Sequence, residues 1–332
     1  MIAQYMDFLK SEEFLAPLGI PAGTEPEFSV LGQGEYNLNY VFVHPVTNQK
    51  LVLRINTGSQ MHLDDQIGYE YAALQCLAPS GRTPKPLHCW PQQRMLVMEY
   101  LNGSALQYER DMEVAARILA DIHSTPVPSD CALLRPAHPA QAIYDECLEM
   151  VQHYFHWEQA DPVVCGLLGQ LIDEIGKLPL REDSDAPLCM VNTELNSGNF
   201  LIDPDGHSHL VDWEKPLLSE PAQDLGHFLA PTTTFWKTDV ILSPQQVKDF
   251  VEKYVAAVDG RMDCTTLPQR LPLFFTVTCL RGVTWCAMAY REYCQPQREL
   301  RNEETFRKLK AYLEPAFLQN LLDNYVRKDF LA

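Results

Sequence analysis

The stretch VNTELNSGNFLIDPDGHSHLVDWE, residues 191–214, decides the fold prediction. We expect three short strands in this region, in CMVN, NFLID and HSHLVDW, with turns at LNSG and at Asp-Pro-Asp-Gly. Three polar side chains, Glu194, Asn199 and Asp212, then fall at strand ends or in tight turns. Phosphoryl transfer needs a carboxylate that deprotonates the attacking hydroxyl and oxygen ligands that hold magnesium, and one hairpin would bring such groups together. A surface hairpin is the alternative, because both turn sequences are common in hairpins.

The same stretch resembles the catalytic segment of the aminoglycoside phosphotransferase and choline kinase superfamily. That family carries H-G-D-x-x-x-x-N, then a strand, then I-D-W/F-E, and here NTELNSGN and VDWE stand in those places. The resemblance implies that Glu194 is the catalytic base and that Asn199 and Asp212 are ligands of Mg²⁺. Downstream, EPAQDLGHFL resembles the family's D-P-x-x-D-L-A stretch, which implies that Asp224 supports the catalytic loop.

Two departures from the family pattern matter for the chemistry. Asn192 replaces the histidine, and Glu194 replaces the catalytic aspartate, so that the carboxylate reaches one methylene further. A misplacement of roughly 1 Å can cost about a hundredfold in rate. Glu194 is therefore either a repositioned base or the mark of a weak or lost activity. The second possibility corresponds to a nucleotide-binding pseudokinase with a regulatory or partner-binding role.

The resemblance implies a two-lobed, protein-kinase-like α+β fold. Residues 1–101 would form a small antiparallel-sheet lobe that binds the nucleotide. Residues 102–332 would form a larger, mainly helical lobe with the catalytic hairpins and a substrate subdomain. The residue patterns agree, because strands are predicted from Phe28 onward and at KLVLRIN, PLHCW and MLVMEY. Helices are predicted at about 61–78, 111–123, 141–157, 162–177, 244–258, 270–294 and 303–326.

The N-terminal strands carry the predicted phosphate-binding residues. Gly32 and Gly34 lie between two strands, as in a loop whose main-chain N–H groups approach phosphates, although a hairpin turn also explains them. The third strand carries Arg54, and the following helix carries Glu70. The resemblance implies that this cation and glutamate pair to align the α- and β-phosphates. The alternative for Glu70 is a solvated helix residue.

The strand MLVMEY leads into Leu101-Asn102-Gly103, a natural linker. The resemblance implies that main-chain groups near Glu99 and Leu101 bind the adenine edge and that Met98 packs nearby. The alternative is that MLVMEY is only a buried strand end, which is compatible with the adenine-binding role.

The sequence says less about the residues that would bind the acceptor substrate. Trp236, Trp285 and Tyr290 are candidates for an aromatic surface that binds an ammonium group, although aromatic residues at helical spacing are more often core. Glu214 and Glu292 are acids that would suit a cationic substrate. His123 ends a helix that resembles the family's L-A-x-L-H helix, and we expect it to be structural.

Composition limits the remaining possibilities. The formal net charge of −18 argues against a nucleic-acid surface and favours a cationic acceptor, although many acidic proteins are acidic for solubility alone. The ten cysteines are scattered, as in a reduced cytoplasmic protein. The most apolar segment, 271–280, stops at Arg281, so that no membrane span is expected. We therefore predict a cytoplasmic kinase that uses ATP or GTP and a small-molecule acceptor, with its oligomeric state open.

Overall fold

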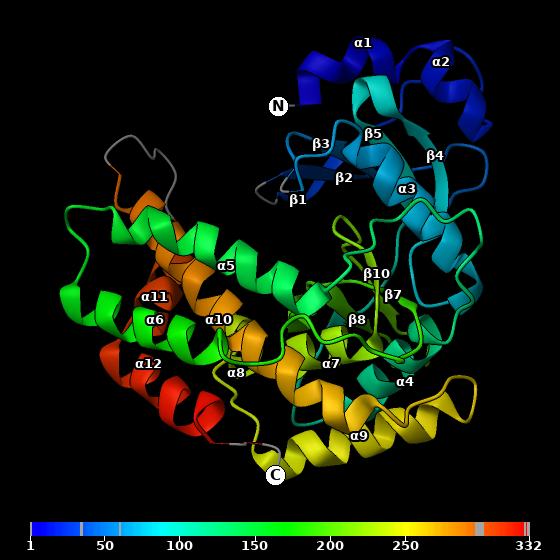
Figure 1. Cartoon of the computed structure of the whole chain (residues 1–332). Coiled ribbons are helices and arrows are strands. Elements are labelled where there is room, and N and C mark those ends of the chain that lie inside the picture. Colours follow the sequence, from blue (N-terminus) through cyan, green and yellow to red (C-terminus); the bar gives the residue numbers. More distant parts are fainter. Residues whose placement is uncertain (1, 34–35, 60, 296–301, 329, 331–332) are drawn as a thin grey trace. The chain divides into compact units, whose positions relative to one another are not determined.

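The computed structural model describes residues 2–33, 36–59, 61–295, 302–328 and 330 (Figure 1). The chain divides into two compact units, which are described separately below. The first unit comprises residues 1–104, 125–133 and 201–216. The second unit comprises residues 105–124, 134–200 and 217–332.

The first unit is built on a five-stranded antiparallel sheet in the order β1-β2-β3-β5-β4. Its strands are β1 (Ser29–Gln33), β2 (Asn37–Val43), β3 (Lys50–Asn56), β4 (Pro86–Trp90) and β5 (Met95–Glu99). The predicted strands are all present, and KLVLRIN coincides with β3. Six of the seven residues of β3 are buried, because this strand lies between β2 and β5 in the middle of the sheet.

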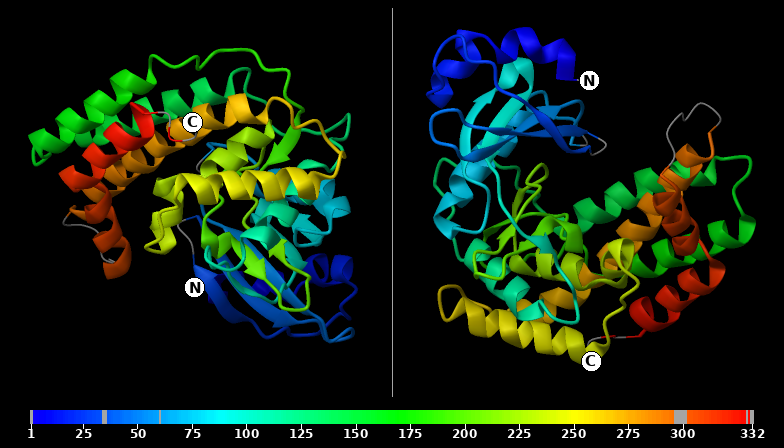
Figure 2. Two further views of the ribbon diagram at one scale, coloured as in Figure 1. Left: turned by 90° about the horizontal axis from the view of Figure 1, so that it is seen from below. Right: turned by 180° about the vertical axis from the view of Figure 1, so that it is seen from behind.

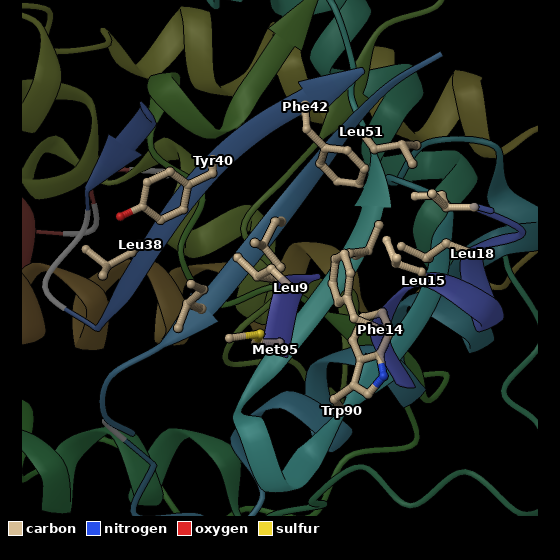
Figure 3. Packing of buried hydrophobic residues seen from close by; sticks show 14 residues of the cluster. Leu9, Phe14, Leu15, Leu18, Leu38, Tyr40, Phe42, Leu51, Trp90 and Met95 are labelled. Atoms are coloured by element: carbon tan, nitrogen blue, oxygen red, sulfur yellow. The ribbon is translucent and has the colours of Figure 1, made fainter. Parts of the chain in front are cut away.

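Short helices at the N-terminus pack against this sheet, a feature that the sequence did not predict. They are η1 (Ile2–Tyr5), α1 (Met6–Leu9), α2 (Glu12–Leu15) and η2 (Ala16–Leu18). Figure 3 shows the apolar cluster that they form with the strands. Phe14 is fully buried and stacks on Trp90, with 4.7 Å between ring centroids. Truncating such a buried aromatic residue costs about 3–5 kcal/mol, so these short helices belong to the core of the unit.

Helix α3 (Gln66–Leu77) follows β3 and starts five residues later than predicted. Asp65 caps it, because its Oδ1 accepts a hydrogen bond from the Gly68 N–H at 2.8 Å. Residues 61–64 precede this cap and belong to no helix. Short 3₁₀ turns, η3 (Ala78–Ser80) and η4 (Pro91–Gln93), flank β4.

A small three-stranded sheet contains the second and third strands of the motif region. Its order is β6-β8-β9, with β6 (Ser104–Ala105), β8 (Phe200–Ile202) and β9 (His209–Leu210). The predicted Asp-Pro-Asp-Gly turn joins β8 to β9, and the Gly206 N–H donates to the Asp203 carbonyl at 3.0 Å. The first predicted strand, β7 (Cys189–Val191), pairs instead with β10 (Leu217–Ser219), which was not predicted.

The second unit is mainly helical, as predicted. Before the C-terminal region it contains the 3₁₀ turn η5 (Ser197–Asn199) and a series of α-helices. These are α4 (Met112–His123), α5 (Pro139–Phe155), α6 (Pro162–Ile175), α7 (Pro221–Leu229), α8 (Pro231–Lys237), α9 (Pro244–Val258) and α10 (Leu267–Tyr293). Figure 2 shows α10 running alongside α5 and α6.

Helix α10 is the one helix of the described residues that is long and apolar enough to cross a membrane by length and composition. Its apolar side chains continue beyond Arg281, so the apolar run is longer than the sequence analysis assumed. The helix packs on α5, α7 and α11, and 67% of its most apolar window is buried. It is the central core helix of the second unit.

The C-terminal region corrects one prediction, a single helix over 303–326. The structure has α11 (Glu303–Tyr312), α12 (Pro315–Leu321) and a π-helical turn, η6 (Leu322–Val326). Pro315 separates the first two because it has no N–H to continue a helix and fits best at a first helical position. All ten cysteines are free thiols, and four of them are fully buried in the second unit, namely Cys147, Cys189, Cys279 and Cys286.

Candidate functional site

Arg54 is the centre of a buried ionic cluster in the first unit. It lies on β3, opposite Asn39 of β2 and Leu96 of β5. Its Nη1 donates to Glu70 Oε1 of α3 at 2.6 Å and to Asp212 Oδ1 at 3.2 Å. Its Nε donates to Asn39 Oδ1 at 3.0 Å. The predicted Arg54–Glu70 ion pair is therefore present, and Asp212 joins it.

Burial makes this cluster electrostatically strong. Arg54 is 7% exposed and Glu70 is 1% exposed, whereas the Asp212 side chain is 32% exposed. Burial alone would lower the pKa of Arg54, but Glu70, Asp212 and Glu214 outweigh that effect and raise it, so the guanidinium stays charged. Burial raises the pKa of Glu70 against the opposing pull of Arg54, and Asp212 adds to the rise. A charge pair this deeply buried is costly to break from either side.

A cavity of about 360 Å³ opens beside this cluster, within the first unit. Its polar lining includes Arg54, Glu70 and Asp212. The buried Glu70 Oε2 has no hydrogen-bond partner among the described residues. The cavity is also lined by apolar residues of the five-stranded sheet, of α3, of the segment after β5 and of β8, namely Leu31, Val52, Leu74, Met98, Leu101 and Leu201. Its volume lies in the range of ligand sites, and it combines apolar walls with a few convergent polar groups.

Gly32 lies within β1, paired with Asn39, and not in a loop between two strands as predicted. It and the predicted linker border the same cavity. Gly32 lines it, and a Cβ built there would meet no atom within 4 Å, so protein packing does not require a glycine at this position. Gly103 also lines the cavity, and there a Cβ would lie 2.8 Å from the main chain of Leu201, so a glycine is required. Glu99 and Leu101 are lining residues too. Gly34 lies outside the described residues.

The segment that carries Asp212 is attached to the sheet and to α3 by further polar contacts. The Glu214 carboxylate accepts a hydrogen bond from Asn37 Nδ2, and the Glu214 carbonyl accepts one from Gln66 Nε2 at 2.6 Å. The Tyr69 hydroxyl donates to the Pro216 carbonyl at 2.5 Å. Asp212 itself has a φ of 66°, in the left-handed region that costs a non-glycine residue of order 1–3 kcal/mol. The contacts of Glu214 and Pro216, on the C-terminal side of Asp212, help to maintain this strained conformation.

The loop after β7, in the second unit, is held by a buried acid. Asp224 of α7 is fully buried and accepts hydrogen bonds from the main-chain N–H groups of Asn192 at 2.8 Å and of Thr193 at 2.9 Å. His123 Nε2 lies 3.2 Å from Asp224 Oδ2, and His123 Nδ1 lies 2.9 Å from the Tyr254 hydroxyl. Asp224 thus binds the main chain of the loop and His123 contacts Asp224, while their role as structural residues stays a prediction.

Glu194 and Asn199 belong to this loop and contact each other. Asn199 Nδ2 donates to the Glu194 carbonyl at 2.7 Å, so its amide oxygen is the group left to act as a cation ligand. The Glu194 N–H donates to Asn192 Oδ1 at 3.0 Å, and the Leu195 N–H donates to His227 Nδ1 at 2.9 Å. Asn192 thus has a local function that a sequence comparison does not reveal, since it fixes the main chain of the residue proposed as the base.

Several contributing residues were missed by the sequence analysis. Nothing in the sequence distinguishes the polar residues Asn37, Asn39 and Gln66. Their role follows only from their side-chain contacts with residues of other elements. For Arg281 the sequence did contain a hint, because this charged residue interrupts the most apolar segment. It pairs with Glu146 and donates to the Thr193 carbonyl.

The aromatic candidates separate into two groups. Trp236 contacts Trp285 edge-on, with 5.2 Å between ring centroids. Tyr290 stacks instead on Phe306 at 5.6 Å and contacts Trp157. No ring contact among the described residues joins Tyr290 to either Trp236 or Trp285, so the structure does not bring the three candidates into one group.

The sheet with its buried Arg54–Glu70 pair and the helical unit with its supported loop define a protein-kinase-like fold. The comparisons agree with this class. The sequence matches the phosphotransferase enzyme family over residues 27–263, and the chain therefore belongs to that family. Its predicted class, a phosphotransferase with an alcohol group as acceptor, is confirmed by this membership. No match was found among curated proteins.

Solved structures with the same fold include three small-molecule kinases. Choline kinase from Cryptosporidium parvum is 14% identical with a TM-score of 0.64, and 91% of each chain is covered. Ethanolamine kinase from Plasmodium vivax is 15% identical with a TM-score of 0.61, and 89% of this chain and 84% of that chain are covered. A spectinomycin phosphotransferase, solved with ADP and spectinomycin, is 15% identical with a TM-score of 0.61, and 96% of each chain is covered. These likenesses confirm the predicted fold class.

Proposed function

We propose that this protein transfers the γ-phosphate of ATP or GTP to a hydroxyl of a small acceptor, with magnesium as cofactor. The observation that carries the proposal is the buried Arg54, which bridges Glu70 and Asp212 at the wall of a ligand-sized cavity. Core packing alone does not explain a buried ion pair, because replacing such a pair by well-packed apolar residues often leaves a protein at least as stable. Family membership supplies the reaction class.

The cavity fits a nucleotide. Arg54 would contact the α- and β-phosphates while Glu70 holds it in place, and the Gly32 region would cover the phosphates. Main-chain groups of Glu99 and Leu101 would bind the base edge, with Met98 packed beside it. Within the part of the chain that is described, no hydrogen bond uses the Leu101 N–H, which therefore suits this role. The space beside Gly32 suits close approach of a ligand.

Asp212 and Asn199 have the donor groups that magnesium prefers. A half-exposed carboxylate and an amide oxygen are hard oxygen ligands. When bound, the cation neutralises charge on the phosphates and polarises the transferred group. The strained φ of Asp212 is consistent with a side chain held for ligation rather than for packing.

Glu194 would accept the proton of the acceptor hydroxyl. The oxygen of that hydroxyl forms the new bond to the γ-phosphorus as the bond to the β–γ bridging oxygen breaks, and the nucleoside diphosphate leaves with that oxygen and its electron pair. The loop contacts of Asn192, Asn199 and Asp224 hold the main chain from which the carboxylate projects. The net charge of −18 favours a cationic acceptor, because an acidic protein attracts cations.

We also propose the accompanying properties that the sequence indicated. Residues 1–101 would supply most of the nucleotide-binding groups, and residues 102–332 would supply the base and the acceptor site. The protein would act in the cytoplasm on small molecules, and not on nucleic acid or membranes. The comparisons lend no support to the pseudokinase alternative.

The experiment is a panel of hydroxyl compounds, incubated with the protein, Mg²⁺ and ATP or GTP, with detection of phosphorylated product by mass spectrometry. The panel would contain aminoglycosides, choline and ethanolamine, sugars, amino alcohols and nucleosides. Once a product is found, Glu194→Gln should lower kcat by about 10²–10⁴-fold, and Glu194→Asp should retain more activity than Glu194→Gln. Glu252→Gln, on the exposed face of α9, is the matched control and should change little. Nucleotide binding without turnover in any form would favour a pseudokinase.

A further inference from the structure

Arg281 is a charged residue in the middle of the core helix α10. Leu280, Val283 and Thr284 around it are buried, and its own side chain is 17% exposed. A cation in such surroundings must be paired to be tolerated. Its partners therefore indicate what the residue does.

Glu146 of α5 anchors the guanidinium. Arg281 Nε donates to Glu146 Oε2 at 2.9 Å, and Nη2 lies 3.5 Å from Glu146 Oε1. Helices α5 and α10 pack along each other, so the carboxylate is a fixed point for the guanidinium. A planar guanidinium held on one side presents its remaining N–H groups in a fixed direction. Here Nη1 donates to the Thr193 carbonyl at 3.4 Å.

The Thr193 carbonyl belongs to the peptide unit that ends at the Glu194 nitrogen. Arg281 binds this peptide at its oxygen, and Asn192 Oδ1 accepts from its N–H at 3.0 Å. Thr193 has a φ of 69°, an unfavourable value for a β-branched residue. In the family pattern a glycine stands at this position. The contacts from Arg281 and Asp224 hold the main chain of Thr193 in a conformation that a glycine would adopt without strain.

The charges around the guanidinium agree with this geometry. Burial alone would lower the pKa of Arg281, but Glu146 outweighs burial and raises it, and Glu194 adds to the rise. Arg281 therefore remains a cation, and it lies close enough to Glu194 for the two charges to interact. Glu146 is the other acid near it, so the cation is shared between a helix and the loop.

We propose that Arg281 is a positioning residue for Glu194: anchored by Glu146, it fixes the peptide between Thr193 and Glu194 and so directs the longer glutamate carboxylate toward the acceptor hydroxyl. This inference rests on the proposed function, since it assigns Glu194 as the base. Arg281 acts through the loop and does not itself take part in the chemistry.

The test compares Arg281→Met and Arg281→Lys with Arg291→Gln. Arg291 is the matched control, because it also connects α10 to α5, through His153, and contacts no residue of the loop in the described structure. Arg281→Met should lower kcat by about tenfold to a hundredfold, as expected for a base displaced by up to about 1 Å, with less than about threefold change in the acceptor KM. Arg281→Lys should recover part of kcat, and Arg291→Gln should stay within about twofold of the parent.

Hydrogen exchange gives a readout that does not depend on turnover. Exchange of the amides in residues 190–195, followed by mass spectrometry, should accelerate several-fold in Arg281→Met and stay unchanged in Arg291→Gln. If Arg281→Met does not fold, Glu146→Gln replaces it, with the same direction and a smaller effect expected.

The outcomes separate the two proposals. Equal kcat and equal exchange in Arg281→Met and Arg291→Gln would overturn the role of Arg281 and leave the kinase function standing. A parallel loss of kcat, acceptor affinity and melting temperature would reduce Arg281 to a structural cross-link and also overturn the proposal. Faster loop exchange in a protein without any turnover would keep the positioning of the loop and contradict the kinase function.

Discussion

The candidate residues fall into two halves, one in each unit, and the two halves are stabilised in different ways. In the first unit, side chains hold one another, since Arg54 binds Glu70, Asn39 and Asp212 directly. In the second unit, side chains hold the main chain, since Asp224 and His227 bind the N–H groups of the loop that carries Glu194. Every member of the first arrangement depends on the identity of its partner. The second arrangement holds the loop mainly through its main chain, and Asn192 and Asn199 add side-chain contacts from within the loop.

This difference explains where the sequence departs from its family. The departures at Asn192, Thr193 and Glu194 all fall in this loop, where the bonds from Asp224 and His227 reach main-chain N–H groups and do not depend on the loop's own side chains. The mutually dependent Arg54, Glu70 and Asp212 fit the family pattern. Substitutions in the two halves should therefore have different consequences.

The largest expected effect comes from the first half. Arg54→Met would leave Glu70 as a buried unpaired acid beside Asp212, and the free energy of unfolding should fall by about 3–5 kcal/mol. Nucleotide-induced stabilisation should disappear as well. Urea unfolding with and without Mg²⁺ and ATP measures both. Arg117→Gln removes an exposed ion pair with Glu113 on α4 and should cost less than about 0.5 kcal/mol. Equal losses in the two variants would contradict a strong buried cluster.

A smaller effect is expected when the support of the loop is weakened. Asp224→Asn keeps one acceptor oxygen but turns the other into a donor that faces main-chain N–H groups or His123. Because Asp224 is fully buried, the free energy of unfolding should fall by about 1–3 kcal/mol, and kcat should fall with it. Asp249→Asn on α9, a partly exposed residue outside the candidate site, is the control. An active Asp224→Asn protein with unchanged stability would show that the loop does not depend on this acid.

Much of this comparison could be predicted from the sequence, because the decisive signals are local. The strand around Arg54, the helix around Glu70 and the hairpin sequence after Asn199 are short-range patterns, and the resemblance arranged them in order. The short N-terminal helices and β10 were missed because elements of three or four residues have little periodicity. The helix expected at 303–326 was divided by Pro315.

The contacts that complete each half are long-range, and the sequence does not show them. Asn37 and Gln66 reach a segment far along the chain, and nothing in their neighbourhood marks them as partners of Glu214. Arg281 was visible only as an interruption of an apolar run. The approach of Asn199 and Asp212 to one cation is also long-range, and it stays a prediction.

The smallest expected effect concerns pH and His209 of β9, in the first unit. Burial lowers the pKa of His209, Arg82 and His207 lower it further, and Glu99 and Asp203 oppose the shift. Because the folded-state pKa is depressed, the stability that neutral His209 contributes is present above the ordinary histidine pKa of about 6.5 and is lost as pH falls through the folded-state value. Chemical unfolding between pH 7.5 and 5 should therefore show a decline that is shallower in His209→Gln. Identical pH profiles would contradict this assignment.

The central proposal is that Asn199 and Asp212 are ligands of one magnesium ion. A double-mutant cycle of Asn199→Ala and Asp212→Asn, with the Mg²⁺-dependent affinity for ATP measured by calorimetry, tests it most directly. If both side chains hold the same cation, either substitution removes most of the Mg²⁺ dependence and the double variant loses little more than the more damaging single one. Losses that add to within about 0.5 kcal/mol would mean independent sites and would contradict the claim.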